Sequence, residues 1–175
     1  VCVAVWTNGI SKGNPMKTRK AEQLAGLVHY IAGRHPDEFG LVTDRDGFIP
    51  VGDLLKVLQE EGWHGVRRVQ LETLSYHLGR SLIEFKDHLV RAVDRSRIEN
   101  GDGKVDLPRQ LYVPVRRRAY EAVLQQGLPP QAHTGKVVLF TTQELARRVG
   151  KRRDANPLIV TVAVSHAIRH GHHFR

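Results

Sequence analysis

Apolar side chains near the beginning of the chain recur with the spacing of a helix. Leu24, Leu27, Val28 and Ile31 stand at positions i, i+3, i+4 and i+7, so they form one stripe of an amphipathic helix. Pro36 ends that helix, because the residue before a proline is pushed out of the helical region of backbone space. The pattern therefore predicts a helix that carries an Arg-His pair at its C-terminal end.

Similar patterns continue up to residue 107. Residues 47–51 predict a short strand, and the apolar stripe that follows predicts a helix that Gly62 closes: Val51, Leu54, Leu55 and Leu58. Residues 69–78 and 83–93 also have helical spacing. The stretch "SRIENGDGKVDL" (residues 96–107) predicts two short β segments around an Asn-Gly-Asp-Gly turn. Small helices followed by a β-ribbon are the order of a winged-helix domain, which we place at residues 16–106.

Beyond a linker at residues 106–110, strands and helices alternate. Residues 111–115, 136–140 and 157–164 predict strands, and a helical turn is expected after the last of them. Residues 116–127 predict a helix with Gly127 at its C-terminal cap. Residues 141–150 predict a helix with Thr141 and Glu144 as its capping box and Gly150 at its end. The fold class is therefore α+β, with a second, small α/β domain at residues 107–175.

Composition and length limit the class of protein. The chain has 175 residues, 41% of them hydrophobic, which suits one or two small globular domains. No run approaches the roughly 18 apolar residues that cross a bilayer, so no membrane association is expected. Cys2 is the single cysteine, which excludes an internal disulfide and fits a reducing cytoplasm. Met16 resembles a natural start, so residues 1–15 are expected to be a leader of no structural weight. The protein is expected to be a monomer.

The net charge of +9 is unevenly distributed along the chain. Residues 1–108 hold 15 Lys and Arg against 15 Asp and Glu, whereas residues 109–175 hold 12 against three, so the whole excess lies in the second part. This asymmetry predicts an anionic partner there, either nucleic acid or a phosphorylated cofactor. A solvated basic surface is the alternative.

The chain lacks most motifs that announce a site by themselves. It has no Gly-rich phosphate loop and no Cys-x-x-Cys, and the histidines of "HGHH" (residues 170–173) have no second ligand cluster, so no metal is expected. Arginines remain: Arg34 beside His35, Arg97 at the predicted ribbon, and the basic run at residues 147–153. Arginine is suited to phosphate, because its planar fork matches two oxygens. Each of these groups is also explained by a helix dipole or by solvation.

Taken in order, these segments resemble the RNA 2′-phosphotransferase family, the KptA-type enzymes. "LVHYIAGRHPDEFGLVTDRDGFIPVGDLL" is similar to the family's signature of Arg-His-x-Pro, Gly-Leu, Asp-x-x-Gly-aromatic and Val-x-acidic-Leu-Leu. "LYVPVRRRAYEAVLQQGLPP" resembles its Leu-Tyr-His-Gly-Thr strand, the next helix and Gly-Leu-x-Pro. "KVVLFTTQELARRVGKRR" resembles the strand and the Ala-x-x-Val-Gly-x-Arg helix that follow.

The resemblance implies a winged-helix domain joined to an ADP-ribosyltransferase-like domain that binds NAD. It also implies removal of an internal 2′-phosphate from RNA, typically at a tRNA splice junction. The RNA phosphate attacks the nicotinamide-bearing ribose carbon and expels nicotinamide, giving an ADP-ribosylated RNA intermediate. The neighbouring ribose hydroxyl then attacks phosphorus, which releases RNA with a free 2′-hydroxyl and ADP-ribose 1″,2″-cyclic phosphate.

By the same resemblance, three residues are expected to be catalytic. Arg34 and Arg97 would hold the RNA phosphate or the ribose edge, and His35 would orient or deprotonate the attacking hydroxyl. The helix is expected to end at Pro36 so that Arg34 and His35 project into the cleft between the two domains.

Tyr112, Lys136 and Arg152 are expected to bind NAD. The family's His-Gly-Thr is Val113-Pro114-Val115 here, and its catalytic arginine falls near His133-Thr134, so Lys136 and Arg152 are the expected substitutes for that cation. The family's Gln-Gly-His-Ser-like loop has no counterpart between Lys104 and Leu111.

Two other functions are compatible with the sequence. A non-catalytic winged-helix protein would bind nucleic acid through Arg67, Arg68 and Arg80 near its recognition helix. The neutral charge of residues 1–108 speaks against it, because phosphate contacts dominate such binding. An ADP-ribosyltransferase that modifies another acceptor, such as a 5′-phosphate end, would use the same residues as the phosphotransferase.

Overall fold

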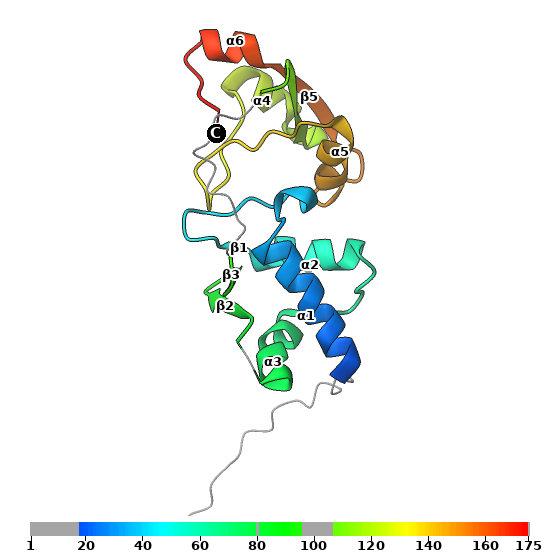
Figure 1. Ribbon diagram of the computed structural model, residues 1–175. Coiled ribbons are helices and arrows are strands. Elements are labelled where there is room, and N and C mark those ends of the chain that lie inside the picture. The colour runs from blue at the N-terminus through cyan, green and yellow to red at the C-terminus, as the bar shows by residue number, and fades with distance from the viewer. Residues whose placement is uncertain (1–17, 80, 96–106, 175) are drawn as a thin grey trace, which may run out of the picture.

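The computed structural model describes residues 18–79, 81–95 and 107–174. These residues form two units, of which the N-terminal unit lies below the C-terminal unit in Figure 1. The N-terminal unit consists of α1 (Thr18–Gly33), η1 (Asp37–Phe39), β1 (Ile49–Pro50), α2 (Val51–Glu60), α3 (Arg68–Leu78), β2 (Ile83–Lys86) and β3 (Leu89–Ala92). The C-terminal unit consists of β4 (Gln110–Val115), η2 (Arg117–Ala119), α4 (Tyr120–Gln126), α5 (Gln143–Lys151), β5 (Leu158–Ala163) and α6 (Val164–Arg169). The α+β class is confirmed.

Helix α1 confirms the apolar stripe from which it was predicted. Leu24, Val28 and Ile31 are fully buried and pack against residues of α2, α3 and the sheet. Leu27 packs at the edge of the same core. Helices α2 and α3 also lie where their spacing predicted them, and Gly62 follows α2 with a φ of +85°. The main hydrophobic core of the described residues therefore belongs to the N-terminal unit.

The prediction of a helix at residues 83–93 is wrong, because this segment forms a hairpin. Strands β2 and β3 pair antiparallel, with Ile83 opposite Ala92 and Phe85 opposite Val90. Asp87 takes a φ of +52° in the turn between them. Residues 83–86 alternate apolar and polar positions, residues 89–92 do not, and apolar segments this short fit a helix and a hairpin equally well. The strand order of the sheet is β1-β3-β2. The hairpin predicted at residues 96–107 lies outside the described residues, except for residue 107.

The C-terminal unit is built on the antiparallel pair of β4 and β5. Both strands were predicted, as were the helix before Gly127, which begins as η2 and continues as α4, and the final turn α6. The strand predicted at residues 136–140 is wrong, because only Phe140 joins the sheet, in a single bridge to Tyr112. In such a ladder the next hydrogen-bonded pair would fall on Pro114, which has no N–H to donate.

Helix α5 begins one residue later than its predicted capping box. The N-cap is Thr142, whose Oγ1 accepts a hydrogen bond from the backbone N–H of Leu145 at 3.3 Å, so the box of Thr141 and Glu144 is wrong. Gly150 lies inside the helix and does not end it. A Cβ at Gly150 would lie 2.7 Å from Cβ of Pro114 and 2.9 Å from Cβ of Pro157. The glycine therefore permits close packing of α5 on the sheet.

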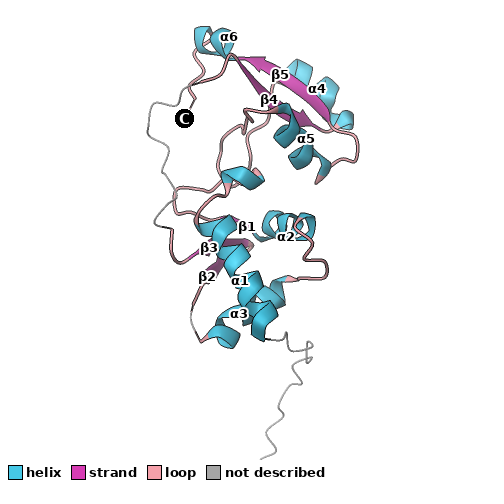
Figure 2. Ribbon diagram, turned by 45° about the vertical axis from the view of Figure 1, so that its right-hand side comes forward, coloured by secondary structure: helices cyan, strands magenta, loops and turns pink. Residues whose placement is uncertain are grey.

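The loop after α1 brings the two units into contact. Helix η1 and the residues that follow it lie between the units in both views (Figures 1 and 2). Gly40 has a φ of +62°, and a side chain there would overlap Cγ2 of Val149 on α5 and approach Cε1 of Phe140 to 3.2 Å. The Gly-Leu that follows the Arg-His helix is thus required where the N-terminal loop packs against the C-terminal unit.

Candidate functional site

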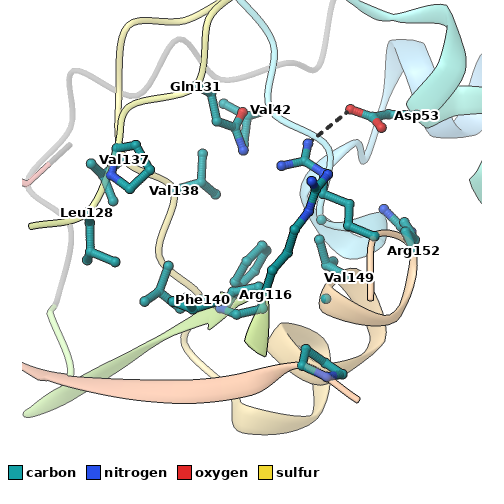
Figure 3. Close-up of a pocket in the computed structure, with 18 of the residues that line it drawn as sticks. Val42, Asp53, Arg116, Leu128, Gln131, Val137, Val138, Phe140, Val149 and Arg152 are labelled. Atoms are coloured by element: carbon teal, nitrogen blue, oxygen red, sulfur yellow. Dashed lines mark ion pairs between the residues drawn. The ribbon is translucent and has the colours of Figure 1, made fainter. Parts of the chain in front are cut away.

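A cavity of about 240 Å³ lies where the two units meet. The N-terminal unit contributes the loop from Gly40 to Val42, together with Pro50 and Asp53. The C-terminal unit contributes the end of β4, the loop before Phe140 and the end of α5 (Figure 3). Because both units supply its walls, the cavity exists only when they are packed together.

The wall contributed by the C-terminal unit is mostly apolar. Val113 and Val115 are buried on β4, and Pro114 lies between them. Other apolar lining residues come from α4, the following loop and α5: Val123, Leu128, Val137, Val138, Phe140 and Val149. The lining also includes exposed residues, Arg116 and Val137, so the cavity is open to solvent on that side.

Three arginines supply the positive charge of the cavity, namely Arg116, Arg152 and Arg153. The Nε of Arg152 donates to one oxygen of Glu60 at 2.6 Å and its Nη2 donates to the other at 2.9 Å. Arg153 pairs with Asp53 at 3.6 Å. Within the described residues, the Arg116 guanidinium forms no ion pair or hydrogen bond with another residue. Two of the three arginines are therefore paired with carboxylates.

The pair between Arg152 and Glu60 also joins α5 to α2. The Arg152 side chain is only 5% exposed, and Arg148 binds the same carboxylate at 3.0 Å and Glu61 at 2.8 Å. Burial alone would raise the pKa of Glu60, but the hydrogen bonds and charges of Arg152 and Arg148 outweigh it and lower the pKa. Glu60 is therefore a carboxylate that holds the two units together.

Comparison with known proteins identifies the family. The chain is 32% identical to a probable RNA 2′-phosphotransferase of Streptomyces griseus over 91% of its own length and 89% of the relative's. It is 30% identical to a probable RNA 2′-phosphotransferase of Acetivibrio thermocellus over 80% of its own length and 78% of the relative's.

The chain belongs to the RNA 2′-phosphotransferase family. A further relative of that name, from Agrobacterium fabrum, is 29% identical over 78% of this chain and 74% of its own. No protein-family model matches the chain. No helix of the described residues is long and apolar enough to cross a membrane.

Two of the predicted catalytic residues of this RNA 2′-phosphotransferase family member lie outside the cavity lining. Arg34 Nη2 lies 3.4 Å from Asp94, and its Nε lies 3.4 Å from Nε2 of His29. His35 Nδ1 lies 3.5 Å from Glu38, and its ring packs against Tyr30. These neighbours hold both side chains at the end of α1.

Arg97, the third predicted catalytic residue, lies outside the described residues. The partner of Arg34, Asp94, stands three positions before Arg97 in the sequence. The predicted role of Arg97, to hold the RNA phosphate or the ribose edge together with Arg34, stays a prediction.

Of the three residues expected to bind NAD, one lines the cavity and two do not. Arg152 lines the cavity, with its guanidinium on Glu60. Tyr112 pairs with Thr161 and Phe140 from β4 and is not among the lining residues. Lys136 is exposed and also lies outside the lining.

Sequence reasoning missed four charged or polar residues of the cavity, namely Gln131 and the three that follow. Arg116 follows the last residue of β4 and resembles an ordinary surface arginine in the sequence. Asp53 is the acidic residue of the family's Val-x-acidic-Leu-Leu signature, which was a signal for it. His133 places Nε2 3.0 Å from the carbonyl oxygen of Val42, so it connects the loops of the two units. Within the described residues no group of three or more His, Cys, Asp or Glu could hold a metal ion.

Proposed function

We propose that this protein removes an internal 2′-phosphate from RNA, typically at a tRNA splice junction, in an NAD-dependent reaction. The observation that carries the proposal is the arginine-containing cavity between two units, in a chain 32% identical to a relative named as a probable RNA 2′-phosphotransferase. A site that brings two anionic reactants together must offset their repulsion, and cations in an apolar cleft do so.

The order of elements supports the proposed domain types. The N-terminal unit has three helices, with β1 between the first two, and a hairpin that pairs with β1 in the strand order β1-β3-β2. This arrangement suits a winged-helix domain. We further propose that the C-terminal unit, with its two-stranded sheet and the cavity at one end of β4, is the ADP-ribosyltransferase-like domain.

The cavity residues fit one end of NAD. Apolar side chains on β4, α4 and α5 suit a planar ring, and Arg116 suits a phosphate. The volume of about 240 Å³ lies below the roughly 300 to 1,000 Å³ of pockets for whole drug-sized ligands, so only part of the dinucleotide is enclosed. When bound, NAD supplies a ribose carbon that accepts the RNA phosphate and nicotinamide as the leaving group. Arg152 lines that wall, and contacts from Tyr112 and Lys136 stay predictions.

The residues at the end of α1 are proposed to act on the RNA. Arg34 would bind the 2′-phosphate, held in place by Asp94 at 3.4 Å. His35, oriented by Glu38 at 3.5 Å, would receive the proton of the attacking ribose hydroxyl and pass it to the departing RNA 2′-oxygen. Arg97 would stabilise charge on phosphorus. The products are RNA with a free 2′-hydroxyl, nicotinamide and ADP-ribose cyclic phosphate.

An assay with and without NAD tests the proposal. An RNA oligonucleotide with one internal 2′-phosphate should lose it only when NAD is present, with one nicotinamide released per phosphate. Arg34→Ala, His35→Ala and Arg97→Ala should each slow this reaction by at least about 100-fold, as loss of one preorganised donor does. Arg147→Ala is the matched control, because Arg147 is exposed on α5 and does not line the cavity. RNA binding without nicotinamide release would instead indicate a non-catalytic RNA-binding protein.

A further inference from the structure

The three arginines of the cavity differ in whether they are available to a ligand. Arg152 gives both of its donors on one edge to Glu60, and Arg153 faces Asp53 at 3.6 Å. Arg116 also lines the cavity, and no carboxylate of the described residues forms an ion pair with it. Among the three arginines of the lining, Arg116 is therefore the one without a carboxylate partner among the described residues.

The position of Arg116 is fixed by the strand before it. Val115 is buried and pairs with Leu158, so the backbone that carries Arg116 is anchored in the sheet. Arg116 itself has an extended backbone, with φ −62° and ψ 135°. Its side chain lies beside Phe140 in the cavity (Figure 3), and the dashed line in that view marks the pair of Arg153 with Asp53.

The charge of Arg116 also acts on Asp154. The pKa of Asp154 is lowered first by the hydrogen bond from the backbone N–H of Arg117, then by that of Asn156, and after these by the charges of Arg117 and Arg116. Those two N–H groups lie 2.9 Å and 3.0 Å from its oxygens. Asp154 therefore has other partners, and Arg116 keeps its donors for a ligand.

We propose that Arg116 is the phosphate-binding residue of this cavity. The ligand is a phosphate group of one of the two reactants, either the 2′-phosphate of the RNA or the pyrophosphate of NAD, so the inference rests on the proposed function. Arginine suits both, because its fork donates two parallel hydrogen bonds to two oxygens. Arg116 lines the cavity but is exposed, so a phosphate can reach its guanidinium from solvent.

Binding measured by calorimetry tests this assignment independently of turnover. The probes are inorganic pyrophosphate, NAD, and an RNA oligonucleotide with an internal 2′-phosphate, each titrated into the full chain. Arg116→Ala should weaken binding of pyrophosphate by about 10- to 100-fold, the usual effect of losing a hydrogen bond to a charged group. Arg116→Lys should recover part of that loss, because it keeps the charge but not the fork. Arg118→Ala is the matched control, since Arg118 is exposed nearby and does not line the cavity.

The probes also identify which reactant supplies the phosphate. Weaker binding of NAD with unchanged binding of RNA assigns the site to the pyrophosphate, and the reverse result assigns it to the RNA 2′-phosphate. Equal affinities of Arg116→Ala and Arg118→Ala for all three probes would overturn the inference, as would a wild-type chain that binds none of them. A wild-type chain that binds pyrophosphate through Arg116 but turns over no RNA would refute the proposed function alone. Thermal melting of each variant confirms that it is folded.

Discussion

Replacement of Gly40 by Ala tests the packing that creates the cavity. Gly40 has φ +62° and ψ 31°, a left-handed conformation that costs a residue with a side chain about 1 kcal/mol. The added methyl would also overlap Cγ2 of Val149, and overpacking of this kind costs about 1 to 3 kcal/mol. Gly40→Ala should therefore lose about 2 to 4 kcal/mol of unfolding free energy, which for a chain of this size lowers Tm by roughly 5 to 15 °C.

The assay is thermal unfolding followed by circular dichroism, with Gly52→Ala as the matched control. Gly52 lies in α2 with nothing within 4 Å of an added Cβ, so the same substitution there should leave Tm unchanged or raise it. Alanine stabilises a helix by about 1 kcal/mol relative to glycine, which sets the upper size of the increase in Tm. If Gly40→Ala melts at the same temperature as Gly52→Ala, the N-terminal loop does not pack on α5, and the cavity is not formed as described.

Three further results are expected from the charged residues between the units. Glu60→Gln should cost about 1 to 2 kcal/mol of unfolding free energy, because it leaves the 5% exposed Arg152 without its carboxylate while Glu60 itself is partly solvated. Chemical denaturation measures this loss, and an unchanged denaturation midpoint would contradict the ion pair. Folding lowers the pKa of Glu60, so the ionised carboxylate stabilises the folded state fully above its unfolded pKa, and this stabilisation is lost as pH falls through the lower folded pKa. Acid unfolding should show this loss in the wild type but not in Glu60→Gln. Asp53→Asn should tighten pyrophosphate binding several-fold by calorimetry, because it frees Arg153 at 3.6 Å, and weaker binding would mean that Asp53 serves the ligand.

Local patterns predicted those elements whose packing follows from their own residues. The stripe from Leu24 to Ile31 could bury itself only as a helix, and α1 formed as expected. Residues 83–93 were different, because each of their two apolar segments is too short to distinguish a strand from a helix. The pairing with β1, which is distant in sequence, decides between the two. The strand expected at residues 136–140 is reduced to the bridge of Phe140 with Tyr112, and on β4 the next position for a hydrogen-bonded pair is Pro114, which has no N–H to donate. These failures were set by contacts distant in sequence.

For the site, too, the sequence predicted single residues but not their distant partners. Arg152 was recognised as a cation, but its partner Glu60 is 92 positions away, and nothing in the local sequence reveals that pair. Arg116 gave no signal, because an arginine after a strand is usually solvated, and only the fold shows that it lines a cavity. The Arg34-His35 motif identified the family from sequence, whereas the way the two units meet required coordinates.

The most direct measurement follows the phosphorus itself. RNA carrying one radiolabelled internal 2′-phosphate is incubated with the enzyme and NAD, and the labelled products are separated. The account predicts that the label leaves the RNA attached to ADP-ribose, with one nicotinamide per label and no reaction when NAD is omitted. Label that appears as free inorganic phosphate, or that remains in the RNA while NAD is present, would contradict it.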